Sequence, residues 1–267
     1  MALHFLVDEG AELSRATGDL AADAEVALRG TLAGAEPGDT VTLTGAEAHH
    51  AAVVRRVRVG EAVTLGDGAG TWLEGEVRDA APKRVVVRVT ARADIAAARP
   101  RLMLVQALAK GDRDELAVQA ATELGADEIV PWQASRSVSR WDAAKAVKGV
   151  ARWQSIVREA AKQAHRAWVP TVTSPVATPV LVARAGTDRV LVLDPTASTP
   201  LAQLEIAPGD ERDLVLVVGP EGGIDPSELD ALSAAGAELV RLGDAVLRTS
   251  TAGPAALAVL NARLGRW

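Results

Sequence analysis

Hydrophobic positions in the first ninety residues follow the short, partly alternating pattern of β-strands. Four runs rich in β-branched residues are separated by turn signals such as the glycine-rich stretch 66–70; they are residues 41–44, 62–65, 71–77 and 84–90. Residues 46–58 have helical composition and end in Arg55, Arg56 and Arg58. The strands predict a small β-barrel. The arginines are either cations that suit the dipole of a helix end or an RNA-contacting edge of the barrel.

The pattern changes after residues 91–100, which are alanine-rich, lack periodicity and end in proline. This stretch predicts a boundary between one domain at residues 1–92 and another at residues 99–267. Beyond it, buried apolar runs alternate with helical segments, and the expected strands are residues 102–108, 128–132, 189–195 and 214–218. The alternation predicts an α/β domain with a parallel sheet covered on both faces. Ligands of such sheets bind at the carboxyl ends of the strands.

Two helices are expected in the second domain. Asp112 opens one helix with capping-box spacing, and Gly125 closes it. Residues 142–168 form the other, with Gly149 as the point where it could break. Its apolar residues recur at helical spacing and predict a buried face made of Trp153, Ile156, Val157, Ala160, Ala161 and Ala164.

Composition narrows the chemistry of this 267-residue chain, which is 48% apolar and contains no cysteine. Disulfides, thiolate nucleophiles and cysteine metal sites are excluded, and four scattered histidines argue against a zinc centre, so we expect no metal. No run of eighteen apolar residues exists, and charge comes too early for a signal peptide. We therefore expect a cytoplasmic protein without a membrane span.

Charge is distributed unevenly about the net value of −6. Residues 136–166 hold eight basic residues against Asp142 and Glu159, which makes this segment +6 and the remainder −12; the basic residues are Arg136, Arg140, Lys145, Lys148, Arg152, Arg158, Lys162 and Arg166. Helical spacing places two sets on shared faces, one made of Lys145, Lys148 and Arg152 and the other of Arg158, Lys162, His165 and Arg166. These faces are either simply solvated or a polyanion-binding surface.

The C-terminal region contains two glycine loops. The apolar run 214–218 leads into Gly219-Pro-Glu-Gly-Gly223, and Asp225, Pro226 and Glu228 then give a strong helix-start signal. The second loop covers residues 241–252. The chain has no Gly-x-x-x-x-Gly-Lys phosphate loop, no Gly-x-Gly-x-x-Gly opening a helix after a strand and no Gly-x-Ser-x-Gly elbow. The loops are either ordinary strand-to-helix turns or a backbone-lined ligand pocket without a phosphate-gripping lysine.

These motifs resemble a known family. Gly219-Pro-Glu-Gly-Gly223 followed by Leu242-Gly-Asp-Ala-Val-Leu-Arg-Thr249 is similar to the C-terminal signature of SPOUT methyltransferases, specifically the RsmE-like uracil-N3 methyltransferases of small-subunit (16S) ribosomal RNA. The likeness covers nearly the whole chain, through the stretches 106–111, 121–125, 135–138, 152–156 and 159–166 and through His49, His50 and residues 53–55. It implies a PUA-like barrel, a deep C-terminal trefoil knot, S-adenosylmethionine as methyl donor and a homodimer with the knots at its interface.

The resemblance also implies site residues. The expected cofactor-binding residues are Leu193, Asp194, Pro195, Val218, Gly219, Pro220, Glu221, Gly222, Gly223, Arg241, Leu242, Gly243, Val246, Leu247, Arg248 and Thr251. The expected RNA-binding residues are His49, His50, Arg55, Arg56, Lys110, Arg136, Arg140, Arg158, Lys162, Gln163 and Arg166. Where family members commonly have glutamate, this chain has Ser250, which we interpret as a helix cap.

The implied reaction needs a base turned out of its stack, because uracil N3 lies on the Watson–Crick edge. N3 must lose a proton, and an arginine could stabilise the resulting anion. Arg248 is the first candidate and Arg136 the second, while Glu221 and water are alternative proton acceptors. Arg248 could instead form an ion pair with Glu221 that only shapes the knot. Two other functions stay open, namely a non-catalytic RNA-binding protein of ribosome assembly and a SPOUT enzyme that acts on transfer RNA or a ribose 2′-hydroxyl.

Overall fold

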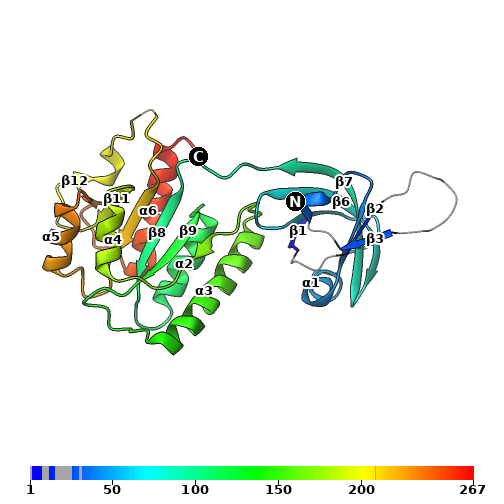
Figure 1. Cartoon of the computed structure of the whole chain (residues 1–267), viewed down its shortest axis with the longest axis horizontal. Coiled ribbons are helices and arrows are strands. Elements are labelled where there is room, and N and C mark those ends of the chain that lie inside the picture. The colour runs from blue at the N-terminus through cyan, green and yellow to red at the C-terminus, as the bar shows by residue number, and fades with distance from the viewer. Residues whose placement is uncertain (1, 8–11, 16–25, 30–31, 208) are drawn as a thin grey trace. The chain divides into compact units, whose positions relative to one another are not determined.

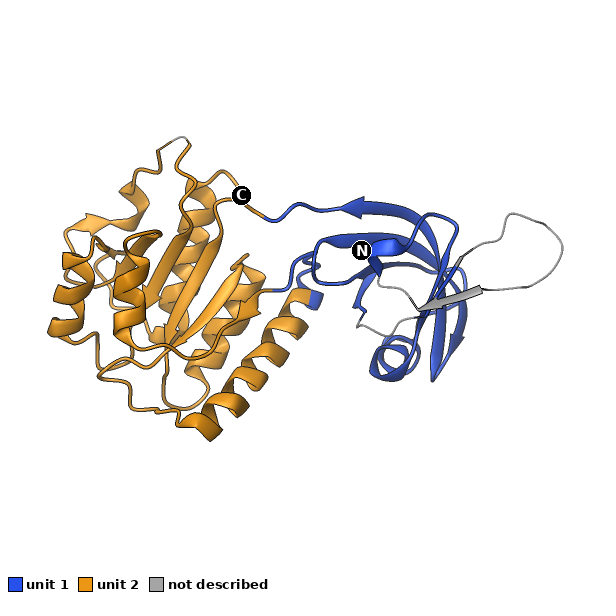
Figure 2. Cartoon of the chain, viewed as in Figure 1, with its two compact units in different colours: residues 1–97, 162–169 blue, residues 98–161, 170–267 orange. Residues whose placement is uncertain are grey.

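The computed structural model describes residues 2–7, 12–15, 26–29, 32–207 and 209–267 (Figure 1). The chain forms two compact units (Figure 2). The N-terminal unit comprises Met1–Ala97 and Lys162–Val169, and the C-terminal unit comprises Ala98–Ala161 and Pro170–Trp267. The expected division at residues 92 and 99 did not include the return of residues 162–169 to the first unit.

The N-terminal unit is built on one seven-stranded sheet with the order β1-β5-β6-β7-β4-β2-β3. Its strands are β1 Leu3–Leu6, β2 Glu12–Arg15, β3 Val26–Arg29, β4 Thr40–Leu43, β5 Ala62–Gly66, β6 Thr71–Ala81 and β7 Arg84–Asp94. β1 pairs with β5 in parallel, and the other pairings are antiparallel. The four predicted strands are therefore confirmed as β4 to β7, whereas β1 to β3 went unpredicted.

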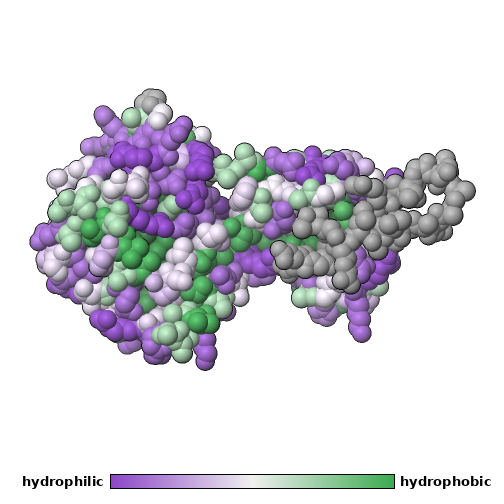
Figure 3. All heavy atoms as spheres, in the orientation of Figure 1, coloured by the Kyte–Doolittle hydropathy of each residue, from purple (hydrophilic) through white to green (hydrophobic). Residues whose placement is uncertain are grey.

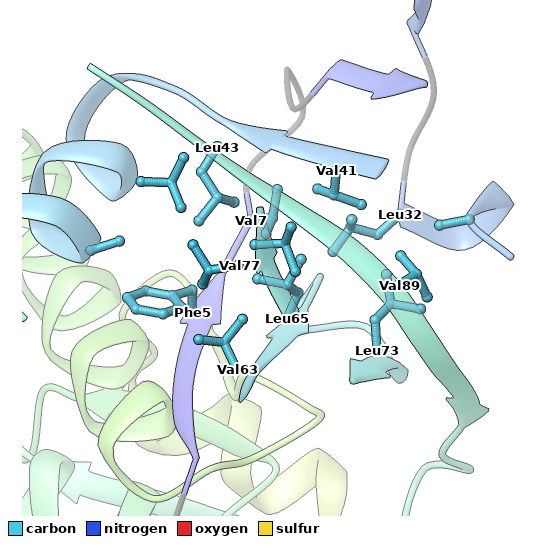
Figure 4. Packing of buried hydrophobic residues seen from close by; sticks show 14 of the residues in the cluster. Phe5, Val7, Leu32, Val41, Leu43, Val63, Leu65, Leu73, Val77 and Val89 are labelled. Atoms are coloured by element: carbon cyan, nitrogen blue, oxygen red, sulfur yellow. The ribbon is translucent and has the colours of Figure 1, made fainter. Parts of the chain in front are cut away.

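The sheet curls around a single apolar core. Figure 4 shows Phe5 and Val7 of the N-terminal segment pointing toward Val63, Leu65 and other side chains of the remaining strands. In β6 the buried positions, such as Leu73 and Val77, alternate with more exposed ones. Burial of the alternating apolar face supplies the main driving force for this unit.

The segment predicted to be helical at residues 46–58 is shorter than expected. A helix α1 covers Gly45–His49, and a π-helical turn η2 continues over His50–Val54. Arg56 then adopts the left-handed region with a φ of 55°, so the helix cannot continue. Arg55, Arg56 and Arg58 are all exposed.

Residues 162–169 form a strap on the N-terminal unit. The indole Nε1 of Trp168 donates to the carbonyl oxygen of Ile95 at 2.7 Å, and the amide of Gly70 donates to Ala167. A Cβ atom on Gly70 would lie 2.7 Å from a ring carbon of Trp168. Glycine at this position therefore allows the strap to approach the backbone closely.

The C-terminal unit contains an all-parallel sheet, as predicted. Its strand order is β10-β9-β8-β13-β11-β14-β12. Its strands are β8 Leu102–Ala107, β9 Glu128–Trp132, β10 Thr171–Val172, β11 Arg189–Leu193, β12 Thr199–Pro200, β13 Leu214–Val218 and β14 Glu238–Arg241. The central strands β8 and β13 are buried along their whole length because both faces of the sheet are covered. Apolar side chains of one face, such as Val105 and Val217, pack with Leu181 and Leu232, which come from two of the helices that cover the sheet.

The helices and short helical turns complete the fold; they are α2 Arg113–Glu123, α3 Ala143–Gln163, α4 Thr178–Arg184, α5 Pro226–Ala234 and α6 Thr249–Arg263, with the turns η1 Leu32–Gly34 and η3 Leu201–Gln203. α6 packs against α2, β8 and β13. Gly125 has a φ of +88° directly after α2, which confirms its predicted role at the helix end. Asp112 precedes α2, but its side chain makes no capping hydrogen bond.

Helix α3 runs without a break, so the break considered at Gly149 does not occur. The glycine instead makes room for a ring, because a Cβ atom there would lie 2.4 Å from Trp141. Trp153, Val157, Ala160 and Ala161 are buried, as the helical spacing predicts. Hydrophilic and apolar residues intermingle on the face drawn in Figure 3. Within the described residues, no helix combines the length and the apolar character needed to cross a membrane.

Candidate active site at the carboxyl edge of the parallel sheet

A cavity of about 520 Å³ lies where β11, β13 and β14 end, at Leu193, Val218 and Arg241. Carboxyl ends of parallel strands meet at one edge of a sheet, which is the usual place for a ligand. The residues that line this cavity are Arg113, Leu193, Asp194, Pro195, Thr196, Val218, Gly219, Pro220, Glu221, Gly223, Ile224, Val240, Arg241, Leu242, Gly243, Ala245, Val246, Leu247, Arg248, Thr249 and Ala252.

The first wall of the cavity is the glycine loop between β13 and α5. A Cβ atom on Gly219 would lie 2.6 Å from Cγ1 of Ile224, which itself lines the cavity, and Gly223 has a φ of +73°. Asp225 and Glu228 form the predicted capping box of α5. The backbone of this loop is therefore fixed at its helical end and left bare of side chains on its glycines.

Glu228 also fixes the surroundings of the glycine loop. Its buried carboxylate accepts hydrogen bonds from the amide of Ser135 at 3.0 Å and from the hydroxyl of Thr178. One side chain thus holds the start of α5, the loop after β9 and the start of α4 together.

The second wall is the loop between β14 and α6. Arg241 pairs with Asp244 at 2.9 Å within this loop, and Val246 is 78% exposed. α6 begins at Thr249 with Arg248 as its N-cap residue, and this cap has no side-chain hydrogen bond. The prediction that Ser250 caps the helix was wrong, because Ser250 lies inside the first turn.

The third wall is the turn after β11. The amide of Asp194 donates to Val240 at 3.0 Å, which ties this turn to β14. Its carboxylate accepts from the amide of Thr196 at 2.7 Å and from the hydroxyl of the same residue. The turn is therefore held by its own aspartate as an Asx-type turn.

Glu221 lines the cavity and is held by two groups, one from the loop between β8 and α2 and one from the first residue of α2. Its Oε1 accepts from Nη1 of Arg113 at 2.9 Å and from the amide of Lys110 at 3.1 Å. Partial burial raises the pKa of Glu221, but hydrogen bonds from its own amide and from Lys110, together with Arg113, outweigh this effect and lower the pKa below its usual value. The ion-pair partner of Glu221 is therefore Arg113 rather than Arg248.

The two candidate arginines occupy different places. Arg248 lines the cavity. Arg136 lies on the outer side of the glycine loop, where its Nε donates to Asp225 at 3.1 Å and its Nη1 is 3.5 Å from the carbonyl oxygen of Gly222. Hydrogen bonds from Ser227, with Arg136 nearby, lower the pKa of Asp225. Arg136 therefore supports the loop from outside.

Sequence comparisons show what kind of protein has this cavity. The family model of the RNA methyltransferase domain matches residues 97–261, and the model of the RNA methyltransferase PUA domain matches residues 43–90. The chain belongs to the RNA methyltransferase family.

Named relatives cover nearly the whole chain. It is 45% identical over 237 residues to the ribosomal RNA small subunit methyltransferase E of Mycobacterium bovis, which is 87% of this chain and 90% of the relative. The protein of the same name from Bacillus subtilis is 30% identical over 233 residues, covering 85% and 91%. A crystal structure of the Neisseria gonorrhoeae protein of this name, bound to S-adenosyl methionine, superimposes with a TM-score of 0.76 at 29% identity and covers 85% of this chain and 93% of that one.

Most residues that the RNA methyltransferase signature implied for the cofactor do line the cavity. Gly222 and Thr251 lie outside its lining. The structure adds lining residues beyond those expected by name; these are Arg113, Thr196, Ile224, Val240, Ala245, Thr249 and Ala252. Arg113 could have been inferred, since it follows the cap of the helix after β8, the strand beside β13.

The residues expected to bind RNA are distributed over both units. Most are exposed; these are His49, Arg55, Arg56, Lys110, Arg136, Arg140 and Gln163, while His50, Arg158 and Arg166 are half-buried. Lys162 is the exception. Its side chain is 5% exposed and its Nζ lies 3.2 Å from Oε1 of Glu47, so its ammonium group belongs to a buried ion pair and not to an RNA-contacting face. Among the described residues, no group of His, Asp and Glu side chains is placed to hold a metal ion.

Proposed function

We propose that this protein transfers a methyl group from S-adenosylmethionine to N3 of a specific uridine in 16S ribosomal RNA. One observation carries the proposal: a cavity at the carboxyl edge of the sheet is lined by residues of three loops, in a chain that is 45% identical to a named ribosomal RNA methyltransferase along most of its length. A protein of the same name was crystallised with S-adenosyl methionine.

The cavity residues fit this cofactor. A volume of about 520 Å³ lies in the range of small-molecule sites. Its lining combines bare backbone at Gly219 and Gly223 with apolar side chains such as Val218, Val240 and Leu242, and it contains no lysine. A Cβ atom on Gly243 would meet nothing within 4 Å, so this loop leaves open space beside its backbone. The residues proposed to hold the cofactor are those of the three walls.

The chemistry divides between the cofactor and the chain. When bound, S-adenosylmethionine supplies an electrophilic methyl group. The chain orients a uracil that has been turned out of its stack and stabilises the negative charge that develops as N3 loses its proton. Arg248 is the cavity cation proposed for this role, and Arg136 is proposed to support the glycine loop. Because Oε1 of Glu221 is occupied by Arg113 and by the amide of Lys110, solvent water is the proton acceptor that we favour.

RNA binding is proposed for exposed residues on each unit. Arg55 and Arg56 of the N-terminal unit follow the π-helical turn, and both are exposed. Lys110 and Arg140 of the C-terminal unit are exposed as well. Phosphate contacts make affinity fall with salt, so Arg55→Gln/Arg56→Gln should weaken RNA binding and flatten its salt dependence while leaving cofactor affinity unchanged. Unchanged RNA binding would show that these arginines are merely solvated and do not contact RNA.

We also propose a trefoil knot for the C-terminal end. Supporting observations are that β14 pairs with β11, while the helix that follows it returns to pack against β8 and β13. A Cβ atom on Gly253 would lie 3.0 Å from Leu104, and Nδ2 of Asn261 donates to the carbonyl of Leu124 at 2.7 Å. The segment after β14 therefore turns back toward β8 and β13, which is the path that a knotted chain would need.

A homodimer is proposed with the second cavity loop at its interface. The support is that Val246 and Leu247 present apolar surface at this loop. Light scattering should give twice the chain mass, and Val246→Asp should give a monomer. Since the proposed substrate is ribosomal RNA, the compartment that we propose is the cytoplasm.

The decisive experiment is nucleoside mass spectrometry after incubation of the purified protein with S-adenosylmethionine and small subunits, or with naked 16S RNA. N3-methyluridine is the expected product. A 2′-O-methyl nucleoside, or modification of transfer RNA alone, would indicate the other kind of SPOUT activity. Cofactor binding without any methylated nucleoside would indicate a non-catalytic RNA-binding protein.

A further inference from the structure

Three cations line the cavity, and they come from different parts of the fold. Arg241 and Arg248 belong to the loop between β14 and α6, whereas Arg113 is the first residue of α2. Arg241 pairs with Asp244 in its own loop. In the sheet, β8, which precedes α2, lies beside β13, and β13 is followed by β11 and β14. Arg113 therefore stands at the opposite end of the cavity edge from Arg241.

Arg113 is held in place from one side. Its Nη1 donates to Oε1 of Glu221 at 2.9 Å, and the same oxygen accepts the amide of Lys110, which lies in the loop leading to α2. The Arg113 side chain is 46% exposed and that of Glu221 is 25% exposed. A guanidinium has five N–H groups in a rigid plane, more than one carboxylate oxygen can accept. The orientation is thus fixed by Glu221 while further donors can reach an acceptor in the cavity.

The proposed reaction provides such an acceptor. As N3 of uracil loses its proton, negative charge spreads onto the two carbonyl oxygens that flank it. A preoriented guanidinium stabilises that charge without reorganising at the moment of reaction, which is the condition for a large effect on rate. Oε1 of Glu221 is occupied by Arg113 and by the amide of Lys110, so the carboxylate is placed to orient the arginine.

We propose that Arg113 is a second catalytic residue, which donates a hydrogen bond to a carbonyl oxygen of the target uracil, and that Glu221 is its positioning residue. This inference rests on the proposed function. In the step that it serves, the N3–H bond breaks and the proton passes to water. The freed N3 lone pair forms a bond to the methyl carbon while the bond from that carbon to sulfur breaks, and its electron pair stays on sulfur as a neutral thioether.

The test compares Arg113→Gln, Arg113→Lys and Glu221→Gln with the intact protein. Arg212→Gln is the matched control, because Arg212 pairs with Asp210 at 2.8 Å, is similarly exposed and lies outside the cavity lining. Calorimetry measures affinity for S-adenosylmethionine. Single-turnover reactions with saturating RNA, read as N3-methyluridine by mass spectrometry across a range of pH, measure the chemical step.

Arg113→Gln should slow methylation by about 100-fold or more, the usual effect of removing one preorganised donor. Its pH–rate profile should shift to higher pH, because the uracil anion is then less stabilised and forms only at lower proton concentration. Affinity for the cofactor should stay within about twofold of the intact protein. Arg113→Lys should recover part of the rate, Glu221→Gln should lose less than Arg113→Gln, and Arg212→Gln should match the intact protein.

Two outcomes would overturn the inference, and each is distinct from a failure of the proposed function. Methylation by Arg113→Gln at the unaltered rate and with an unshifted pH profile would remove Arg113 from the reaction. A slow variant whose loss is fully explained by weaker cofactor binding would make Arg113 a cofactor residue instead. If the intact protein itself made no N3-methyluridine, the proposed function would fall, and the assignment of Arg113 with it.

Discussion

The hydroxyl of Thr249 donates a hydrogen bond to the carbonyl oxygen of Gly219 at 2.9 Å and so joins the two glycine loops directly. The same hydroxyl accepts a hydrogen bond from Nε2 of Gln106 at 2.8 Å. Gln106 is fully buried on β8, and its side chain also donates to the carbonyl of Ala107. This chain of hydrogen bonds fixes the start of α6 against the start of the glycine loop. The two walls of the cavity are therefore one structural unit, although thirty residues of sequence separate them.

Replacing Thr249 with valine should loosen this junction. The change keeps the shape of the side chain but leaves the carbonyl of Gly219 without its donor and the side-chain amide of Gln106 with only the carbonyl of Ala107 as acceptor, at a cost of about 1–3 kcal/mol. We expect a lower midpoint in urea unfolding and weaker binding of S-adenosylmethionine in calorimetry. Thr249→Ser keeps the hydroxyl and serves as the control. Equal cofactor affinity in the serine and valine variants would show that the hydrogen bond does not shape the cavity.

Gly219→Ala should disturb the cavity through a single atom. The added Cβ would lie 2.6 Å from Cγ1 of Ile224, closer than two carbon atoms can approach, so Ile224 must move. Because Ile224 lines the cavity, cofactor affinity should fall by about tenfold or more, which is about 1.4 kcal/mol. Gly186→Ala is a suitable control, since its Cβ would meet only the carbonyl of Ala183 at an ordinary 3.6 Å. Calorimetric titration of both variants distinguishes an effect specific to the glycine loop from the effect of replacing any glycine.

How much of the fold could be predicted depended on how local its signals are. The capping box of Asp225 and Glu228 lies within four residues, and the apolar runs of the parallel sheet are continuous, so both were predictable. Short strands such as β12 and β14 have little pattern of their own and are fixed by pairing with β11 and with each other. Local signals also misplaced Ser250, because α6 begins at Thr249 with Arg248 as its N-cap residue, two residues before the start that a cap at Ser250 would give.

The same contrast between local and long-range signals holds for the candidate site. The cofactor loops follow from motifs that are contiguous in the chain, and most of their residues do line the cavity. Arg113 lies more than a hundred residues from Glu221 in sequence, so no spacing rule connects them. Lys162 sits near the end of α3 between the half-buried Arg158 and Arg166, and only its ion pair with Glu47 reveals that its side chain is buried.

Lys162→Met should destabilise the N-terminal unit. The substitution leaves the carboxylate of Glu47, whose side chain is 15% exposed, without the ammonium group that lies 3.2 Å away. Removing one partner of a buried ion pair costs about 3–5 kcal/mol, whereas replacing both with apolar residues often costs little. Chemical unfolding should therefore show a large loss in the single variant and a smaller one in Lys162→Met/Glu47→Leu. Lys83→Met removes an equal charge from an exposed turn and should leave the unfolding midpoint unchanged.

His4 should make the stability of the same unit depend on pH. Its ring stacks on Trp72 at 4.3 Å between centroids, and its Nδ1 lies 3.0 Å from the hydroxyl of Thr64. Burial first, and then the neighbouring His165 and Lys162, lower the pKa of His4 to about 4. In the unfolded chain histidine titrates near pH 6.5. The neutral ring therefore contributes its full stability above about pH 6.5, and this contribution is lost as the pH falls toward about 4.

Urea unfolding at several values between pH 7 and pH 4 measures this dependence. Carboxylates titrate in the same range, so the informative quantity is the difference between the intact protein and His4→Phe, which keeps an aromatic ring against Trp72. The difference in free energy of unfolding should shrink as the pH is lowered. His49→Phe, at an exposed position, should follow the intact protein. Parallel curves for the intact protein and His4→Phe would rule out a titrating contribution from His4.

Arg248 and Arg136 can be separated by how their replacement affects turnover and cofactor binding. Arg248 lines the cavity, and its side chain makes no capping hydrogen bond to α6. Arg248→Ala should therefore reduce turnover by about 100-fold while cofactor affinity and fold persist. Arg136 donates to Asp225, the cap of α5, and lies against Gly222, so Arg136→Ala should act through the glycine loop. Its expected effect is weaker binding of S-adenosylmethionine with a smaller loss of turnover at saturating cofactor. Steady-state kinetics with varied cofactor measures both. Arg136→Lys keeps a cation beside Asp225 and should recover much of the affinity, whereas a large loss of turnover at saturation in Arg136→Ala would place Arg136, rather than Arg248, at the reacting base.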